Sequence, residues 1–426
     1  MIGPRIAAGV RSEAEVNLTD VGATIANILE VPLPHSYGRV ISEAMIDPPT
    51  SPAPVGMSHP AAAEGHLIAQ EWLSSSDHRT AIVLNGERVS SEDALHAEAP
   101  TIASRGPVTV ACWREMFINN DPIETSPWTP ACRHTNSDGA WSDFRFPANP
   151  VSPYFKPSLS IAEGGQLWAA FVDNIHGNSA AIEQPVRVYR WTAAASWQSA
   201  EPPISDVTFA LRPSIVPTPT GAVVAFVTSD TGSDDLLPDD IEALKSRVRF
   251  RRHIQIHRVH WPEGAEVAST VQTWRSYTAD HFLEDALAPA PEGTWIGWSS
   301  YGRMDRPALS KGEGPIHLAF LAMEADGGVS HLLYIQSSDQ GTTWTEPTSV
   351  DSTSVATNVT PTFSGDHLFW ARNAGEGVSI CHWHSEDGTT CAETAATAID
   401  GLSIQDNTWT AGLLIDDVWQ VVTEEW

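Results

Sequence analysis

The sequence predicts an all-β protein, a β-propeller of six blades or alternatively seven, preceded by a short α/β extension. Three observations favour this fold. A strand-forming segment recurs with a period of roughly fifty residues, as four-stranded propeller blades do. The chain has 31 Pro, 29 Gly and 17 Trp but only 18% charged residues, which excludes a disordered chain and a coiled coil. No apolar run approaches the roughly 20 residues of a membrane-spanning helix, so we expect no membrane span.

Residues 1–46 predict a strand, a turn and one helix. Thr19 and Asp20 supply oxygens that can cap the amino terminus of the helix. Apolar residues then recur at helical spacing until Pro32 and Pro34 end the segment. A single amphipathic helix cannot bury its own apolar stripe, so this helix must dock on another element.

Four stretches of this segment share Pro and Gly punctuation around the helix: Ile2–Val10, Asn17–Leu29, Val31–Pro34 and Gly38–Ala44. Together they resemble the closing part of an alkaline phosphatase superfamily domain, as in sulfatases and phosphodiesterases. In that family the nucleophile and most metal ligands precede this tail. The resemblance therefore implies a carboxyl-terminal remnant without phosphatase or sulfatase activity, left by a gene fragment, a misassigned start or a decayed fusion.

Residues 47–63 are expected to form a Pro-rich linker and residues 64–426 the propeller. The repeated unit is a Pro, a small and an apolar residue, several turn residues, and a strand that ends in an aromatic residue. A degenerate copy near Trp298 lies inside the one interval that is almost twice as long as the others. Dividing the region by the period gives six or seven blades, and we favour six. The units begin at Pro100, Pro157, Pro213, Pro307 and Pro361.

One turn motif supports the repeat. The segment Ser337-Ser-Asp339-Gln-Gly341-Thr-Thr-Trp344 matches the Asp-box pattern S-x-D-x-G-x-x-W. The Ser and Asp side chains can satisfy turn amides, the Gly can take a positive φ, and the Trp can cover the flank of the blade. With this motif, residues 64–426 resemble a six-bladed sialidase-like (BNR repeat) β-propeller. In that family the turn lies away from the ligand face, so the resemblance assigns Ser337, Asp339, Gly341 and Trp344 to stability.

Three cations directly precede the repeated prolines: Lys156, Arg212 and Arg306. If these prolines begin the innermost strands, the three side chains surround the mouth of the central channel. Guanidinium groups there would grip a carboxylate or sulfate through charge-assisted hydrogen bonds. In sialidases an arginine triad holds the substrate carboxylate in a comparable place, and Lys156 departs from that pattern. The alternative is that each cation is solvated or paired locally.

The ends of the second strands would reach the same face, which adds Arg114 and Arg372 as ligand-binding candidates. The resemblance implies a Tyr nucleophile activated by a Glu, with an Asp as acid/base. Tyr301 is the candidate nucleophile, and Asp173 or Asp230 is the candidate acid. A surface or packing role is the alternative for each of these residues.

No metal site is predicted. His253 and His257 fall on one face of a strand and His260 on the other, which disfavours a shared ion. The oxygen-rich segment 228–242 lacks EF-hand spacing, so a solvated loop is favoured and Ca²⁺ is the alternative. We expect no other cofactor.

The four cysteines form two local pairs, Cys112 with Cys132 and Cys381 with Cys391. Each pair is flanked by strand-like residues and separated by a turn, which favours cross-strand disulfides, with free buried thiols as the alternative. Disulfides would suit an extracellular or periplasmic protein, although no export signal is visible near Met1.

The chain carries 53 Asp and Glu against 24 Lys and Arg, a formal charge of −29. Such a field repels phosphate backbones, so nucleic acid is not an expected partner. A solvated surface explains the charge, with cation-binding loops as the alternative. We expect a monomeric propeller that recognises acidic glycans or other anionic small ligands and is non-catalytic alone. The alternatives are a sialidase-like exo-glycosidase and a scaffold that binds protein.

Overall fold

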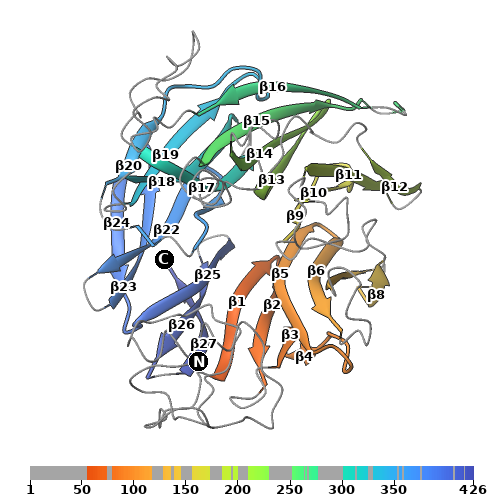
Figure 1. Ribbon diagram of the computed structural model, residues 1–426, viewed down its shortest axis with the longest axis vertical. Helices are drawn as coiled ribbons and strands as arrows, with labels where there is room; N and C mark the ends of the chain where they lie inside the picture. Colours follow the sequence, from red (N-terminus) through yellow and green to blue (C-terminus); the bar gives the residue numbers. More distant parts are fainter. Residues whose placement is uncertain are drawn as a thin grey trace, which may run out of the picture.

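The computed structural model contains only β-strands among the residues that it describes, so the all-β prediction is confirmed (Figure 1). The expected α/β extension over 1–46 lies outside these residues. Within the described part, no helix has the length and apolar character needed to cross a membrane. The described residues are 55–73, 79–117, 128–135, 139–144, 156–172, 185–192, 195–199, 210–229, 252–262, 264–265, 268–276, 301–311, 314–324, 330–352, 355–356, 359–374, 377–405, 408–416 and 418–426.

Three sheets are single antiparallel meanders of four strands. The first contains β5 (His96–Arg105), β6 (Val108–Met116), β7 (Trp128–Thr135) and β8 (Trp141–Phe144); the second β9 (Ser158–Ile161), β10 (Leu167–Val172), β11 (Val186–Thr192) and β12 (Ala195–Ser199); the third β21 (Thr362–Ser364), β22 (His367–Ala374), β23 (Gly377–His384) and β24 (Gly388–Glu393).

Two further sheets have seven and eight strands. The seven-stranded sheet contains β25 (Ala398–Gln405), β26 (Thr408–Ile415), β27 (Val418–Glu425), β1 (Val55–Ala63), β2 (His66–Trp72), β3 (Thr80–Leu84) and β4 (Glu87–Arg88); the eight-stranded sheet contains β13 (Ala210–Thr218), β14 (Gly221–Ser229), β15 (Arg252–His260), β16 (Ser269–Arg275), β17 (Tyr301–Lys311), β18 (Ile316–Glu324), β19 (Ser330–Ser337) and β20 (Thr348–Asp351).

Each wide sheet consists of two antiparallel meanders joined by a short parallel pairing. Val55 of β1 pairs with Val418 of β27, and Arg252 of β15 pairs with Arg303 of β17. Counted as continuous hydrogen-bonded sheets, the described residues form five blades, so the expected six, or alternatively seven, is wrong. The proline repeat marks the first strand of a meander, and it carries no signal for the parallel pairing that merges two meanders into one sheet.

The sheets surround a common centre, which confirms the β-propeller (Figure 1). The first strands of successive meanders contact one another in chain order, from β1 through β5, β9, β13, β17 and β21 to β25, and β25 contacts β1. The ring therefore closes between the first and last described strands. It also begins at Val55, because β1 occupies Val55–Ala63. The boundary at residue 64 and the assignment of 55–63 to a linker are corrected accordingly.

The apolar core lies between neighbouring meanders. All six residues of β10 are buried, and Trp168 of β10 shares a cluster with Phe226 of β14. A strand that is covered on both faces reads as a continuous apolar run without alternation. The second strands are therefore the most apolar segments, and they hold the inner ends of the sheets in place.

Both cysteine pairs are disulfide-bonded, which confirms the cross-strand alternative over free thiols. Cys112 lies opposite Cys132 on β6 and β7, and Cys381 lies opposite Cys391 on β23 and β24. Each bond joins the second and third, or third and fourth, strands of a meander and leaves the channel side free.

The turn after β19 is held by side-chain hydrogen bonds. The carboxylate of Asp339 accepts bonds from the backbone N–H groups of Thr342 (3.0 Å) and Thr343 (2.8 Å), and from the Ser337 hydroxyl (2.8 Å). Gly341 has a φ of 82° and donates its N–H to Ser337 Oγ at 2.8 Å. Trp344 packs against the cluster between β14 and β18.

Burial by itself would raise the pKa of Asp339. The hydrogen bonds from Thr343, and then those from Ser337 and Thr342, outweigh burial and lower the pKa to about 2. The carboxylate therefore stays charged and bonded over the whole physiological range. This is the behaviour of a group that stabilises a turn.

Candidate functional site

Five first strands share a β-bulge, where an extra residue interrupts the pairing with the second strand. The register shifts fall at equivalent positions of β1, β5, β13, β17 and β25. Three of the bulged residues directly precede a repeated proline, and His59 directly precedes Pro60. The residues with positive φ are His59 (50°), Ala99 (56°), Arg212 (48°), Arg306 (53°) and Gly401 (80°).

The proline accounts for the interrupted pairing but not for the positive φ before it. It has no N–H to donate to the ladder, and its ring disfavours helical angles in the residue before it. A positive φ at a non-glycine residue costs about 1–3 kcal/mol, and such strain concentrates at functional sites. Arg212 and Arg306 both carry this strain. Because a bulge redirects the side chain that it carries, these two arginines are positioned by the repeat itself.

Lys156 lies near the axis of the ring. Its ammonium group interacts electrostatically with Asp400, Arg306, Arg212 and Arg114, which come from β25, β17, β13 and β6. Only a position close to the common centre is within reach of four different meanders. The structure thus brings together four of the five cations named as ligand-binding candidates. We call Lys156, Arg212, Arg306 and Arg114 the mouth cluster.

Buried carboxylates hold part of the mouth cluster in place. Arg212 forms an ion pair with Asp305, and Arg114 Nη2 lies 2.7 Å from Glu98 Oε2. Both carboxylates are almost fully buried. Asp305 also accepts the backbone N–H of Arg306 at 2.8 Å. The alternative of local pairing is therefore correct for Arg212.

These acids and one histidine were not predicted from the sequence. Glu98 and Asp305 each stand two residues before a repeated proline, and Asp400 occupies the equivalent bulge of β25. His59 Nδ1 lies 2.9 Å from Asp400 Oδ2. Glu98 and Asp305 could have been found from their position, because each is an acidic residue two positions before a repeated proline. A count of charges over the whole chain does not reveal this spacing.

The pKa of Lys156 is lowered from 10.5 to about 8. The largest cause is desolvation by the surrounding protein, and the nearby Arg306, Arg212 and Arg114 lower it further, while Asp400 opposes them. The side chain nevertheless remains exposed to solvent, as expected in an open channel with protein on all sides. Among the described residues, Lys156 forms no hydrogen bond or ion pair.

Arg372, the fifth cation predicted to bind a ligand, contacts a different set of residues from the mouth cluster. Its Nε and Nη2 lie 3.0 and 2.8 Å from Asp351 Oδ2, and Trp370 Nε1 donates to the same oxygen at 2.7 Å. The Asp351 side chain is only 2% exposed. The structure therefore places Arg372 in a buried network between β20 and β22 and does not join it to the mouth cluster.

The catalytic candidates are only partly described. Tyr301 begins β17, and its backbone pairs with Glu324 at the end of β18. Asp173 and Asp230 lie outside the described residues, as does most of the oxygen-rich segment 228–242. Two of the histidines on β15 bond to neighbouring side chains. His257 Nε2 lies 3.0 Å from Gln255 Oε1, and Arg275 Nε donates to His253 Nε2 at 3.0 Å.

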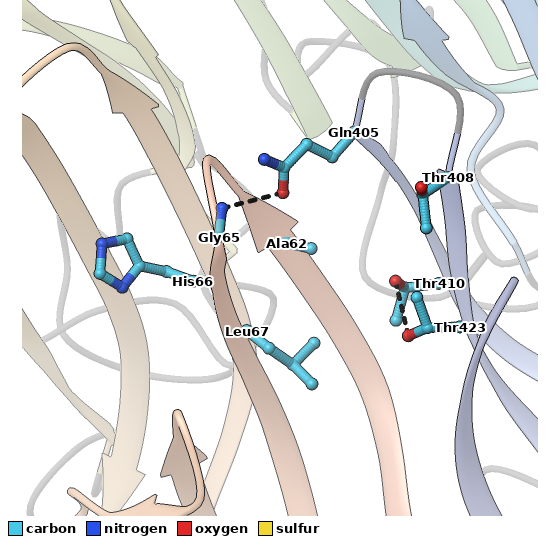
Figure 2. A pocket seen from close by; sticks show the side chains of 8 residues that line it. All are labelled: Ala62, Gly65, His66, Leu67, Gln405, Thr408, Thr410 and Thr423. Atoms are coloured by element: carbon cyan, nitrogen blue, oxygen red, sulfur yellow. Dashed lines mark hydrogen bonds between the residues drawn. The ribbon is translucent and has the colours of Figure 1, made fainter. Parts of the chain in front are cut away.

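A shallow pocket lies where the first and last meanders meet (Figure 2). It is lined by Ala62, Gly65, His66 and Leu67 of the β1–β2 hairpin, and by Gln405, Thr408, Thr410 and Thr423 of β25 to β27. Gln405 accepts the Gly65 N–H at 3.1 Å, and Thr410 and Thr423 are bonded at 3.1 Å. The lining offers hydroxyl and amide groups and no Lys, Arg, Asp or Glu, so it suits an anion less well than the mouth cluster does.

No family model matches the chain, and no curated protein matches it. Among solved structures, it is similar to a puromycin-hydrolysing peptidase of Mycobacterium tuberculosis, with 14% identity, a TM-score of 0.48, and coverage of 87% of this chain and 52% of that one. A Trypanosoma rangeli sialidase with sialic acid gives 11% identity, a TM-score of 0.45, and coverage of 85% and 59%. A polysaccharide lyase, an ulvan lyase bound to a GlcA–Rha3S chain, gives 12% identity, a TM-score of 0.45, and coverage of 88% and 94%.

The chain thus spans little more than half the length of the peptidase and the sialidase, and nearly all of the lyase. Likenesses this remote say nothing of its activity. The propeller assignment rests on the strand pairing and ring closure described above.

Proposed function

We propose that this β-propeller binds an anionic ligand, a carboxylate- or sulfate-bearing glycan, at the mouth cluster. The observation that carries the proposal is Lys156. Its ammonium interacts with three guanidinium groups, the residue is exposed to solvent, and it forms no ion pair with any described residue. At neutral pH the group is mostly charged, because its pKa remains about 8.

The pKa of Lys156 indicates why an anion would be favoured there. Desolvation lowers that pKa most, and Arg306, Arg212 and Arg114 lower it further, while Asp400 raises it. An anion beside Lys156 would favour its charged form and accept charge-assisted hydrogen bonds. The whole chain has a formal charge of −29, whereas the four cations of the mouth cluster outnumber the three carboxylates of Glu98, Asp305 and Asp400 near them. The mouth cluster therefore departs locally from the acidic character of the chain.

The charge geometry requires only an anion. The choice of a glycan rests on the resemblance of residues 64–426 to sialidase-like propellers, carried by the Ser337–Trp344 motif. We further propose that the protein acts outside the cytoplasm, which its two disulfides support. Residues 1–46 are in this view a remnant of an alkaline-phosphatase-type hydrolase.

The test is a binding screen with sialylated, sulfated and uronic oligosaccharides, repeated with Lys156→Gln. Lys156 has no ion pair to lose among the described residues, so this variant should fold as the wild type does. We expect its affinity for the best anionic ligand to fall about tenfold or more, since a charge-assisted contact contributes about 1.5–3 kcal/mol. The control is Arg105→Gln, which removes a surface cation paired with Glu163 and should leave the affinity unchanged. Equal affinity in Lys156→Gln and wild type would refute the proposal.

A sialidase-like exo-glycosidase is the second candidate. The observation in its favour is the backbone pairing of Tyr301 with Glu324, because sialidase chemistry uses a Tyr next to a Glu. Hydrolysis of an aryl sialoside by the wild type, abolished in Tyr301→Phe, would support it. No turnover by the wild type under conditions in which it binds acidic sugars would leave only the binding role.

A further inference from the structure

Three side chains meet at one end of the β21–β24 meander. Asp366 lies in the turn between β21 and β22, His367 begins β22, and His384 ends β23. One ligand atom from each lies within 4.8 Å of the other two. Asp366 Oδ2 is 3.3 Å from His384 Nε2, and Asp366 Oδ1 is 3.8 Å from His367 Nε2. The strand register produces this meeting, since Leu368 pairs with Trp383 and thereby aligns the start of β22 with the end of β23.

The outward-facing nitrogen of each imidazole is also occupied. His367 Nδ1 lies 2.8 Å from His382 Nε2, and His384 Nδ1 lies 3.4 Å from Asp387 Oδ2. Histidines that ligate metals nearly always engage their second ring nitrogen in this way, because the bond fixes the tautomer and the orientation of the ring. The rings of His367 and His384 stack at 4.6 Å, which aligns the two Nε2 atoms on one side.

We propose that Asp366, His367 and His384 bind a divalent first-row transition ion, with Zn²⁺ as the representative. Two imidazole nitrogens and one carboxylate oxygen suit such ions, whereas Ca²⁺ and Mg²⁺ prefer oxygen ligands alone. Ligands held 2.0–2.1 Å from a tetrahedral Zn²⁺ are about 3.4 Å apart. The 3.3 Å from His384 Nε2 to Asp366 Oδ2 matches that value, and the 3.8 Å from His367 Nε2 to Asp366 Oδ1 exceeds it by about 0.4 Å. Since the three ligand atoms lie within 4.8 Å of one another, the side chains would have to move closer together to bind the ion. Three protein ligands leave the remaining positions to water or to a solvent-borne ligand.

An ordinary surface ion pair explains these contacts less well. Asp366 and His367 are 57% and 44% exposed, and an exposed pair gains little energy from holding two side chains in one geometry. It would not require both Nδ1 atoms to have partners. The ion would connect the β21–β22 turn to the β23–β24 hairpin, which the Cys381–Cys391 bond already fastens.

This site is separate from the mouth cluster. Thr360, which accepts a 3.4 Å bond from Arg306, precedes β21, and Asp366 follows it. The two sites are therefore at opposite ends of β21, and neither proposal depends on the other.

The decisive experiment is titration of the purified, chelator-treated full chain with Zn²⁺ against a competing chromophoric chelator. We expect one ion per chain at the site, with affinity reduced about tenfold or more in Asp366→Asn and in His384→Gln. His382→Gln removes only the positioning contact and should reduce affinity less. The matched control is His260→Gln, because His260 is exposed at the far end of β15 and should not alter binding.

A second readout identifies the ligands. Cu²⁺ bound at the site should show hyperfine coupling from two nitrogens in its electron paramagnetic resonance spectrum, and from one nitrogen in His384→Gln. Thermal unfolding of each variant with chelator present checks that its fold is intact, and the midpoints should match that of the wild type. Absence of a stoichiometric site in the wild type, or affinity unchanged in both Asp366→Asn and His384→Gln, would overturn the proposal. Competition by millimolar Ca²⁺ would likewise contradict the ligand chemistry.

Discussion

Asp339 and Lys156 are both charged, both exposed, and treated in opposite ways by the fold. Asp339 receives hydrogen bonds from Thr342, Thr343 and Ser337, and these outweigh desolvation and lower its pKa to about 2, so its charge is stabilised. Lys156 is desolvated and surrounded by arginines, and its pKa falls to about 8, so its charge is disfavoured. A charge that the chain satisfies by itself serves stability. A charge that the chain disfavours is the one that we propose for ligand binding, and this contrast separates the turn after β19 from the channel mouth.

The largest effect is expected at the turn, from Gly341→Val. Gly341 has a φ of 82°, and a Cβ there would lie 2.4 Å from Val223 Cγ2. Strain and overpacking together should lower the free energy of unfolding by about 3 kcal/mol, measured by urea denaturation. Gly86→Ala is the control, because Gly86 has a φ of 84° but no atom within 4 Å of an added Cβ, and it should cost only about 1 kcal/mol. Equal losses would show that steric fit at the turn is unimportant.

The next effect is expected at the mouth cluster, from Arg212→Ala. Asp305 is 1% exposed and would lose its ion pair with Arg212. Since Arg212 itself is 37% exposed, the loss is discounted for solvent screening to about 2 kcal/mol. Adding Asp305→Asn should recover part of the loss, because it removes the uncompensated charge. A double variant that is additive would show that the two residues are not energetically coupled.

A smaller effect is expected from Asp339→Asn, and it should depend on pH. The folded pKa of Asp339 is depressed from 3.8 to about 2, so its stabilisation is fully present above about pH 4 and is lost as pH falls through 2. The exposed position limits the loss at neutral pH to about 1 kcal/mol. Urea denaturation at pH 6 and pH 2 should show a difference between wild type and variant only at the higher pH. A difference of equal size at both values would contradict the charge argument.

The smallest effect on stability, and one of opposite sign, is expected from Lys156→Gln. The cost of charging Lys156 is present below about pH 8 and is relieved between that value and 10.5. The variant should therefore match or slightly exceed the wild type in stability at pH 7, and the wild type should gain on it as pH rises through this window. Ligand affinity of the wild type should fall above pH 8, with proton uptake on binding. A Lys156→Gln variant that is clearly destabilised at pH 7 would remove the contrast with Asp339.

Local patterns in the sequence predicted what local geometry controls. The repeated prolines marked the first strands of meanders, because proline cannot donate to the ladder and is tolerated at a strand start or a bulge. They lie directly before β9 and β21 and at the bulge inside β5, β13 and β17. Cys112 and Cys132 were paired correctly because both lie on adjacent strands of one meander. The motif from Ser337 to Trp344 forms its own turn, so its hydrogen bonds needed no distant partner.

Local sequence patterns could not predict pairings between residues far apart in the chain. The five-sheet arrangement depends on contacts such as Val55 with Val418, between opposite ends of the chain. Asp366, His367 and His384 were overlooked because their meeting depends on the register of β22 against β23, and a one-residue change in register would separate them.

By itself the sequence determined the strand content, the spacing of the meanders and the residues offered at each bulge, since these follow from the conformational limits of proline, glycine and β-branched segments over a few residues. Only the tertiary structure decided which of those residues share a neighbourhood. Closure of the ring places Lys156 within electrostatic reach of Arg114, Arg212 and Arg306, which are far apart in the sequence. The energy of interaction between charges depends on their separation and on their access to solvent, and the fold determines both quantities.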